Sequence, residues 1–175
     1  MRRRATLPGV DDPAAVPRYT LRLAKEDFKF AAAHFTMFPD GTGELLHGHN
    51  FRVRVALSGV APDEMGLLAD VAALKERIRA VCDGLDEHTL IPERSRLLSL
   101  RHEADSVEIA FGERTYQLPA ADVTLLPIHN VTIETMAHLV WYRLAPSLAG
   151  GRIDRLTVEV EETAGQSCAY EAAIA

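Results

Sequence analysis

The sequence predicts a single α+β domain, in which a four-stranded antiparallel sheet is covered on one face by two helices. Two observations lead to this class. Segments with alternating apolar and polar residues occur in both the N-terminal and the C-terminal half, and two segments between them have apolar residues at helical spacing. With 175 residues, 47% of them hydrophobic and 25% charged, the chain is long enough to bury one core. We therefore expect one domain over residues 19–175.

The predicted strands come in two pairs. Residues 19–35 are extended, with a break near residues 25–27, and residues 47–58 alternate regularly. The Pro- and Gly-containing loop at 38–43 turns the chain between them, so the first pair forms a β-hairpin. Residues 153–161 and 167–174 supply the second pair. Because such a sheet leaves one face and its edges without partners, we expect a homo-oligomer.

Two helices are predicted between these strands. Asp70 can cap a helix that runs through about Cys82, and a second helix starts near Thr132 and ends before Pro146. In both segments, apolar residues recur at intervals of three and four, which gives each helix one apolar face. Residues 107–111 and 115–118 predict a small β-hairpin within an insertion of about residues 93–123.

Composition excludes several classes of partner. The formal net charge of −6 argues against a nonspecific nucleic-acid surface. No apolar run approaches the length of a membrane span, and the basic N-terminus is not followed by the apolar core of a signal peptide, so we expect a cytoplasmic protein without a membrane partner. Cys82 and Cys168 form no metal-binding motif and are expected to be reduced. Residues 1–18 are expected to form a flexible arm.

Three histidines of the first hairpin predict a metal site. Side chains at positions i and i+2 of a strand project from the same face, so His47 and His49 point the same way. His34 ends the preceding strand and can lie beside them. Three imidazoles without a thiolate form the open type of zinc site, in which water or substrate takes the remaining position. The alternative is that each histidine is a hydrogen-bonded structural residue.

Short motifs along residues 20–172 occur in an order that identifies a family. They are Phe30-x-Ala32-x-His34, Leu46-His47-Gly48-His49-Asn50-Phe51, Gly66-x-x-x-Asp70, Leu85-Asp86, Thr132-x-Glu134-x-x-Ala137, and Glu162-Thr163 followed by Tyr170. In this order they resemble the 6-pyruvoyltetrahydropterin synthase and 6-carboxytetrahydropterin synthase family.

The resemblance implies the tunnelling fold, in which subunits close their sheets into a barrel and the sites lie at subunit interfaces, with a hexamer expected. It implies Zn²⁺ on the three histidines and 7,8-dihydroneopterin triphosphate as the small-molecule substrate. Glu162 matches the glutamate that anchors the pterin, and Thr132 and Glu134 match a second pterin-binding element. An N-cap role for Thr132, with Glu134 favoured by the helix dipole, is the alternative.

The chain departs from the family pattern at its catalytic base. Common members have a cysteine four residues before the first histidine of the HGH motif, where this chain has Gly43. Glu44 is next to it, and the string from Glu44 to Asn50 resembles the variant branch in which glutamate replaces cysteine. A carboxylate desolvated beside zinc could serve as the base. The alternative is a loop glutamate exposed to water.

A second departure concerns the aspartate–histidine pair that acts as an acid–base relay in the family. Asp86 and His88 are the predicted pair, although the family spacing, counted back from Leu90, places Glu87 at the position of the histidine. Either the shift removes the imidazole from the site, or the loop adjusts to keep it there. His129 is a possible substitute.

The resemblance therefore implies a zinc-dependent lyase that acts on the side chain of 7,8-dihydroneopterin triphosphate and gives 6-hydroxymethyl-dihydropterin. Glu44 is its expected base, and Asp86 with His88 its relay. The first alternative is a 6-carboxy- or 6-pyruvoyl-tetrahydropterin synthase using the same substrate. The second is a homologue that binds zinc or pterin without catalysis.

Overall fold

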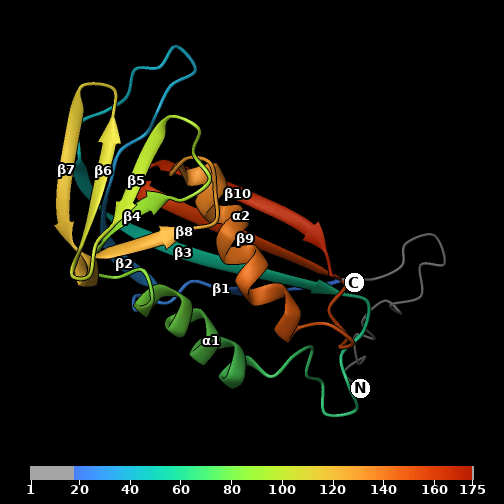
Figure 1. The fold of residues 1–175 in the computed structure, drawn as a ribbon. Coiled ribbons are helices and arrows are strands. Elements are labelled where there is room, and N and C mark those ends of the chain that lie inside the picture. The colour runs from blue at the N-terminus through green and yellow to red at the C-terminus, as the bar shows by residue number, and fades with distance from the viewer. Residues whose placement is uncertain (1–17, 175) are drawn as a thin grey trace, which may run out of the picture.

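A computed structural model describes residues 18–174, with an α+β architecture (Figure 1). Nearly all of the predicted arm, residues 1–17, lies outside the described residues. The helices are α1 (Val71–Asp83) and α2 (Ile133–Leu144), with short 3₁₀ turns at Ala120–Asp122 and Ala145–Ser147. The strands are β1 (Tyr19–Leu23), β2 (Lys29–His34), β3 (His47–Gly59), β4 (His88–Pro92), β5 (Leu98–His102), β6 (Ser106–Phe111), β7 (Arg114–Pro119), β8 (Val123–Leu126), β9 (Arg155–Thr163) and β10 (Gln166–Ala173).

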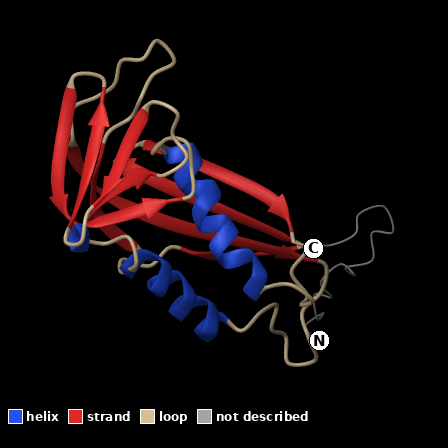
Figure 2. Ribbon diagram, viewed as in Figure 1, coloured by secondary structure: helices blue, strands red, loops and turns tan. Residues whose placement is uncertain are grey.

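The main sheet confirms the predicted class and is larger than expected. It has seven strands in the order β10-β9-β3-β2-β4-β8, with β1 paired to β3. The first predicted segment is two strands, which lie end to end along β3: β2 pairs with residues 47–52 and β1 with residues 55–59. Both helices lie on one face of this sheet, as predicted (Figure 2).

The sheet is mixed rather than wholly antiparallel, because β4 pairs in parallel with both β2 and β8. These two strands were not expected from the sequence. Each has only four or five residues, too few to show a period of two, and each is joined to its neighbour by a long connection. They extend the sheet beyond β2, on the side away from β9.

The predicted insertion folds into a separate antiparallel sheet of three strands, β5-β6-β7, rather than a hairpin alone. Strands β6 and β7 are the predicted hairpin, and β5 adds to its free edge. Side chains from this sheet and from the main sheet form a second apolar cluster beside the main core. Its buried members are Phe35, Met37, Ile91, Val107, Ile109 and Phe111.

The helix starts are formed by the residues predicted to cap them. The Asp70 carboxylate accepts a hydrogen bond from the Ala73 N–H at 3.0 Å. Thr132 and Thr135 exchange side-chain and backbone hydrogen bonds in a capping box at the start of α2. Residues 18–174 contain no helix that is long and apolar enough to cross a membrane.

Candidate metal and substrate site

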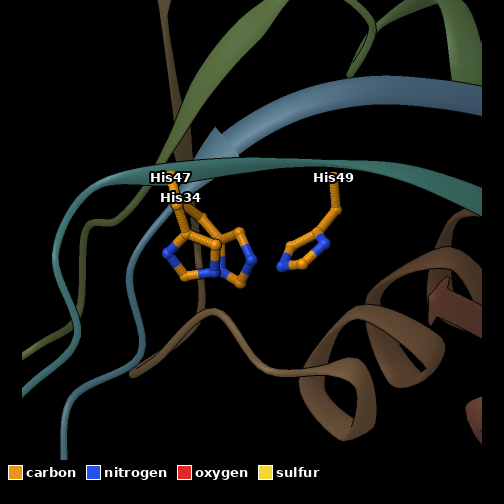
Figure 3. Close-up of side chains that lie close together, drawn as sticks. All are labelled: His34, His47 and His49. Atoms are coloured by element: carbon orange, nitrogen blue, oxygen red, sulfur yellow. The ribbon is translucent and has the colours of Figure 1, made fainter.

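Strand pairing brings the three predicted histidines together. His34, the last residue of β2, lies directly opposite His47 in β3, and His49 is two residues further along β3. All three imidazoles therefore project from the same face of the sheet, toward the segment that leads into α2 (Figure 3). One nitrogen from each ring lies within 4.8 Å of the others.

Backbone carbonyls determine the tautomers of two of these rings. Nδ1 of His34 lies 3.3 Å from the Val131 carbonyl oxygen, and Nδ1 of His47 lies 2.7 Å from that of Leu45. A carbonyl can only accept, so each of these Nδ1 atoms carries a proton, and in the neutral ring Nε2 keeps a lone pair. A metal-bound histidine uses the same arrangement, with one nitrogen donating to the protein and the other coordinating.

The burial of His34 gives the strongest indication of a metal site. Its side chain is only 1% exposed, and its buried Nε2 has no hydrogen-bond partner among residues 18–174. Burial lowers the pKa of His34, and the nearby charge of Glu162 opposes that shift only in part. A neutral imidazole with a free lone pair is the form that binds a metal, so the residues present fit Zn²⁺.

Glu162, in β9, lies directly beside the histidines. Its Oε1 is 3.0 Å from Nε2 of His34 and 3.8 Å from Nε2 of His49, while Gln166 donates a hydrogen bond to Oε2. Because Nε2 of His34 carries no hydrogen in the tautomer described above, a lone pair and a carboxylate oxygen face each other across this contact. Such an arrangement is favourable when a cation is shared between them.

Glu44 lies close to the third histidine, His47. Its Oε2 is 3.9 Å from Nε2 of His47 and accepts a hydrogen bond from the Thr36 N–H at 3.0 Å. Burial acts to raise the pKa of Glu44, but the hydrogen bonds from Thr36 and the neighbouring imidazoles outweigh it and lower the pKa. The carboxylate is therefore ionised at neutral pH and able to accept a proton. Its side chain is exposed, with 41% of its surface accessible, so it is not the desolvated carboxylate expected from the sequence and agrees in this respect with the exposed alternative.

The predicted substrate-binding residues share a cavity with Glu44 and the histidines. The cavity has a volume of about 440 Å³ and contains residues from β3, β9, the start of α2 and the loop before β3. The cap residue Thr132 and Glu134 of the first turn both line it. The full lining is Thr36, Glu44, His47, His49, Thr132, Ile133, Glu134, Glu162, Thr163 and Gln166.

Asp86 and His88 do not line this cavity, and their side chains do not pair. The Asp86 carboxylate accepts the Ala31 N–H at 2.6 Å, and Nδ1 of His88 lies 2.5 Å from the Asp86 carbonyl oxygen. Between them, Glu87 adopts a left-handed φ of 58°. This turn, together with the strand that follows it, places His88 in a second surface hollow, which shares only His49 with the lining of the cavity. His129 also lies outside the cavity, with Nδ1 against the Arg94 carbonyl.

Sequence reasoning missed three residues that shape the site. Thr36 and Gln166 bind the carboxylates of Glu44 and Glu162, respectively, and Arg114 donates to the backbone beside Glu44. The position of Thr36, two residues after His34, was a usable signal because it continues the same face of the chain. Arg114 gave no such signal, because it lies 70 residues from Glu44.

Comparison with known proteins identifies the fold and the family. The family model described as 6-pyruvoyl tetrahydropterin synthase matches residues 22–173. A Methanocaldococcus jannaschii protein with the name "Putative 6-carboxy-5,6,7,8-tetrahydropterin synthase" is 26% identical over 145 residues, which are 81% of this chain and 88% of that protein.

Solved structures agree with this match. The crystal structure of 6-pyruvoyl tetrahydropterin synthase from Plasmodium vivax superposes with a TM-score of 0.85 and 27% identity, over 90% of this chain and 99% of that one. A variant of the same protein, described as a catalytic-residue mutant with glutamate replaced by alanine, matches with the same TM-score and coverage at 28% identity. The architecture is the tunnelling fold. The chain therefore belongs to the 6-pyruvoyl tetrahydropterin synthase family of pterin synthases.

Proposed function

We propose that the protein is a zinc-dependent lyase that cleaves the side chain of 7,8-dihydroneopterin triphosphate and releases 6-hydroxymethyl-dihydropterin. The observation that carries the proposal is the placement of Glu44. Its ionised carboxylate lies 3.9 Å from His47, next to a glycine where common members of the family have a cysteine. The catalytic glutamate named for the Plasmodium vivax protein supports a carboxylate in this role.

The three histidines would hold the metal through their Nε2 atoms or, for His49, through either ring nitrogen. When bound, Zn²⁺ polarises a coordinated hydroxyl and stabilises the negative charge that develops on its oxygen. The tautomers of His34 and His47 prepare the chain for this role before any metal arrives, because the backbone carbonyls already hold the Nδ1 protons.

Glu44 would act as the base. Cleavage of a carbon–carbon bond next to a hydroxyl requires removal of the hydroxyl proton, and the electron pair of the broken bond passes to the pterin ring, so no oxidant is needed. The Thr36 N–H holds the carboxylate in place while one oxygen remains available to take that proton. The carbon next to the ring then takes up one proton, from Glu44 or from solvent, to complete the hydroxymethyl group, and the rest of the side chain leaves as an aldehyde that keeps the triphosphate.

The pterin would bind at Glu162, beside the histidines. A carboxylate accepts hydrogen bonds from the amino and ring N–H groups of a pterin edge, and Glu162 offers one, held by Gln166. Thr132 and Glu134, at the start of α2, would complete the pocket. In the proposed cytoplasmic homo-oligomer, expected to be a hexamer, Asp86 and His88 would face a neighbouring subunit's site, because they do not reach the cavity of their own chain. There the Asp86 backbone carbonyl, rather than its carboxylate, would orient the His88 ring.

Product identification tests this proposal. Zinc-loaded protein is incubated with 7,8-dihydroneopterin triphosphate, and the products are identified by mass. Release of 6-hydroxymethyl-dihydropterin is the expected result. Binding of the substrate without turnover would contradict the proposal and indicate a homologue that has lost catalysis.

A second candidate is a 6-carboxy- or 6-pyruvoyl-tetrahydropterin synthase. The observation in its favour is the name of relatives such as the Methanocaldococcus jannaschii protein, with which this chain shares 26% identity. The same incubation separates the candidates, because loss of triphosphate with an oxidised side chain would identify this reaction instead.

A further inference from the structure

We propose that Arg114 and Phe111, on the inserted sheet, are positioning residues for Glu44. They fix the loop that carries this carboxylate and fill the space in which a side chain at position 43 would lie. The inference rests on the proposed role of Glu44 as the base. It gives the insertion a catalytic purpose, although the insertion contributes no side chain to the cavity lining.

Arg114 binds two successive backbone carbonyls, those of Gly43 and Glu44. Its Nη1 donates to the Glu44 carbonyl at 2.5 Å, and its Nη2 donates to the Gly43 carbonyl at 3.0 Å. The guanidinium also lies over the Phe111 ring, 4.8 Å from its centroid. A planar group with two parallel donors and a stacking partner has one preferred orientation, so it restrains the loop more than a single hydrogen bond would.

The Phe111 ring fills the space next to Gly43, where a side chain at position 43 would lie. A Cβ atom added to Gly43 would lie 2.6 Å from Cε1 of Phe111 and 2.9 Å from the Thr36 carbonyl oxygen. The ring is only 3% exposed and stacks on Phe35, with 5.7 Å between ring centroids. It therefore has little freedom to move aside, and a cysteine at position 43 would have to displace this ring or the Thr36 carbonyl.

These contacts define the location of Glu44 from two directions. On one side, the Glu44 N–H donates to the Thr36 carbonyl at 2.9 Å, and the Thr36 N–H donates to the Glu44 carboxylate. On the other side, Arg114 holds the carbonyl of the same residue. Loss of Arg114 would leave the hydrogen bonds between Thr36 and Glu44 intact but remove the restraint on the other side of the loop. The Glu44 carboxylate would still be present, in a less well-defined position.

The test compares Arg114→Ala with Arg101→Ala in zinc-loaded protein. Arg101 lies in β5 of the same inserted sheet, is exposed, and pairs with Glu108. We expect Arg114→Ala to lower kcat on the order of 10- to 100-fold, with KM and zinc content near those of the parent protein. Arg114→Lys, which keeps the charge and one donor, should restore part of the loss, and Arg101→Ala should match the parent. Thermal unfolding of each variant shows whether the fold is kept.

A double-mutant cycle with Glu44→Gln distinguishes an effect of Arg114 through Glu44 from a general disturbance of the structure. If Arg114 acts through Glu44, then Arg114→Ala should cause little further loss in residual turnover when Glu44 is already glutamine. An equal loss in both backgrounds, or no loss in either, would overturn the positioning role. Full activity of Glu44→Gln alone would instead overturn the proposed base, so the two failures give different results.

Discussion

Two backbone carbonyls decide the chemistry available to His34 and His47. By holding the Nδ1 protons, they leave both Nε2 lone pairs directed at one point, beside the carboxylate of Glu162. The sequence predicted the three histidines, because strand periodicity places them on one face. It could not predict the hydrogen bond from His34 to the Val131 carbonyl, because these residues are 97 positions apart and meet only in the tertiary fold.

The two cysteines should differ sharply in reactivity. Burial raises the pKa of Cys82 to about 12, and its side chain is packed in the main core. Cys168 is partly exposed, although burial also raises its pKa above the ordinary value. At pH 8, iodoacetamide should therefore modify Cys168 alone in the folded protein, and Cys82 only after denaturation, as read by peptide mass. Labelling of native Cys82 at a rate similar to that of Cys168 would contradict this packing.

At the scale of secondary-structure elements, the long periodic segments could be predicted and the short ones could not. Helices α1 and α2, strand β3 and the pair β9–β10 all follow the patterns in the sequence, and the caps Asp70 and Thr132 were identified correctly. Strands β4, β5 and β8 were missed because four or five residues carry too little periodicity. Strands β4 and β8 also pair with segments in other parts of the chain, which only the tertiary fold brings next to them.

The inserted sheet packs tightly against the loop before β3, so replacing Gly43 should lower the free energy of unfolding. Gly43→Ala should destabilise the protein by about 1–3 kcal/mol, because the added methyl group meets the Phe111 ring and the Thr36 carbonyl. Gly84→Ala is the matched control, since a Cβ atom there is 3.5 Å from its nearest neighbour and the backbone is right-handed helical. Chemical denaturation should show a loss for the first variant only. Equal stabilities of the two variants would show that the loop is not tightly packed.

At the scale of the whole molecule, metal binding and folding should be coupled. The three ligands come from two strands and meet only when β2 and β3 pair, so Zn²⁺ binds the folded chain in preference to the unfolded one. Zinc should therefore raise the melting temperature of the parent protein and have little effect on His47→Ala. A similar increase in both would place the metal elsewhere.

This stabilisation should weaken in acid. The folded pKa of His34 is lowered below its ordinary value of 6.5, so between these two values the unfolded chain binds more protons than the folded one. Stability is thus present above about pH 6.5 and declines as the pH falls below it. Protons also compete with the metal for the imidazoles, so the effect of zinc on melting should shrink over the same range. A zinc effect that is constant from pH 7.5 to 5.5 would contradict histidine ligation.

Glu44, placed beside the histidines by its loop, is the proposed base. The most direct measurement is the turnover of 7,8-dihydroneopterin triphosphate by Glu44→Gln and by the parent protein at equal zinc content. Glutamine is close in shape and keeps an oxygen that can accept the Thr36 N–H, but it cannot take a proton at neutral pH. We predict a loss of kcat on the order of 100-fold or more. Equal turnover of the two proteins would contradict the claim.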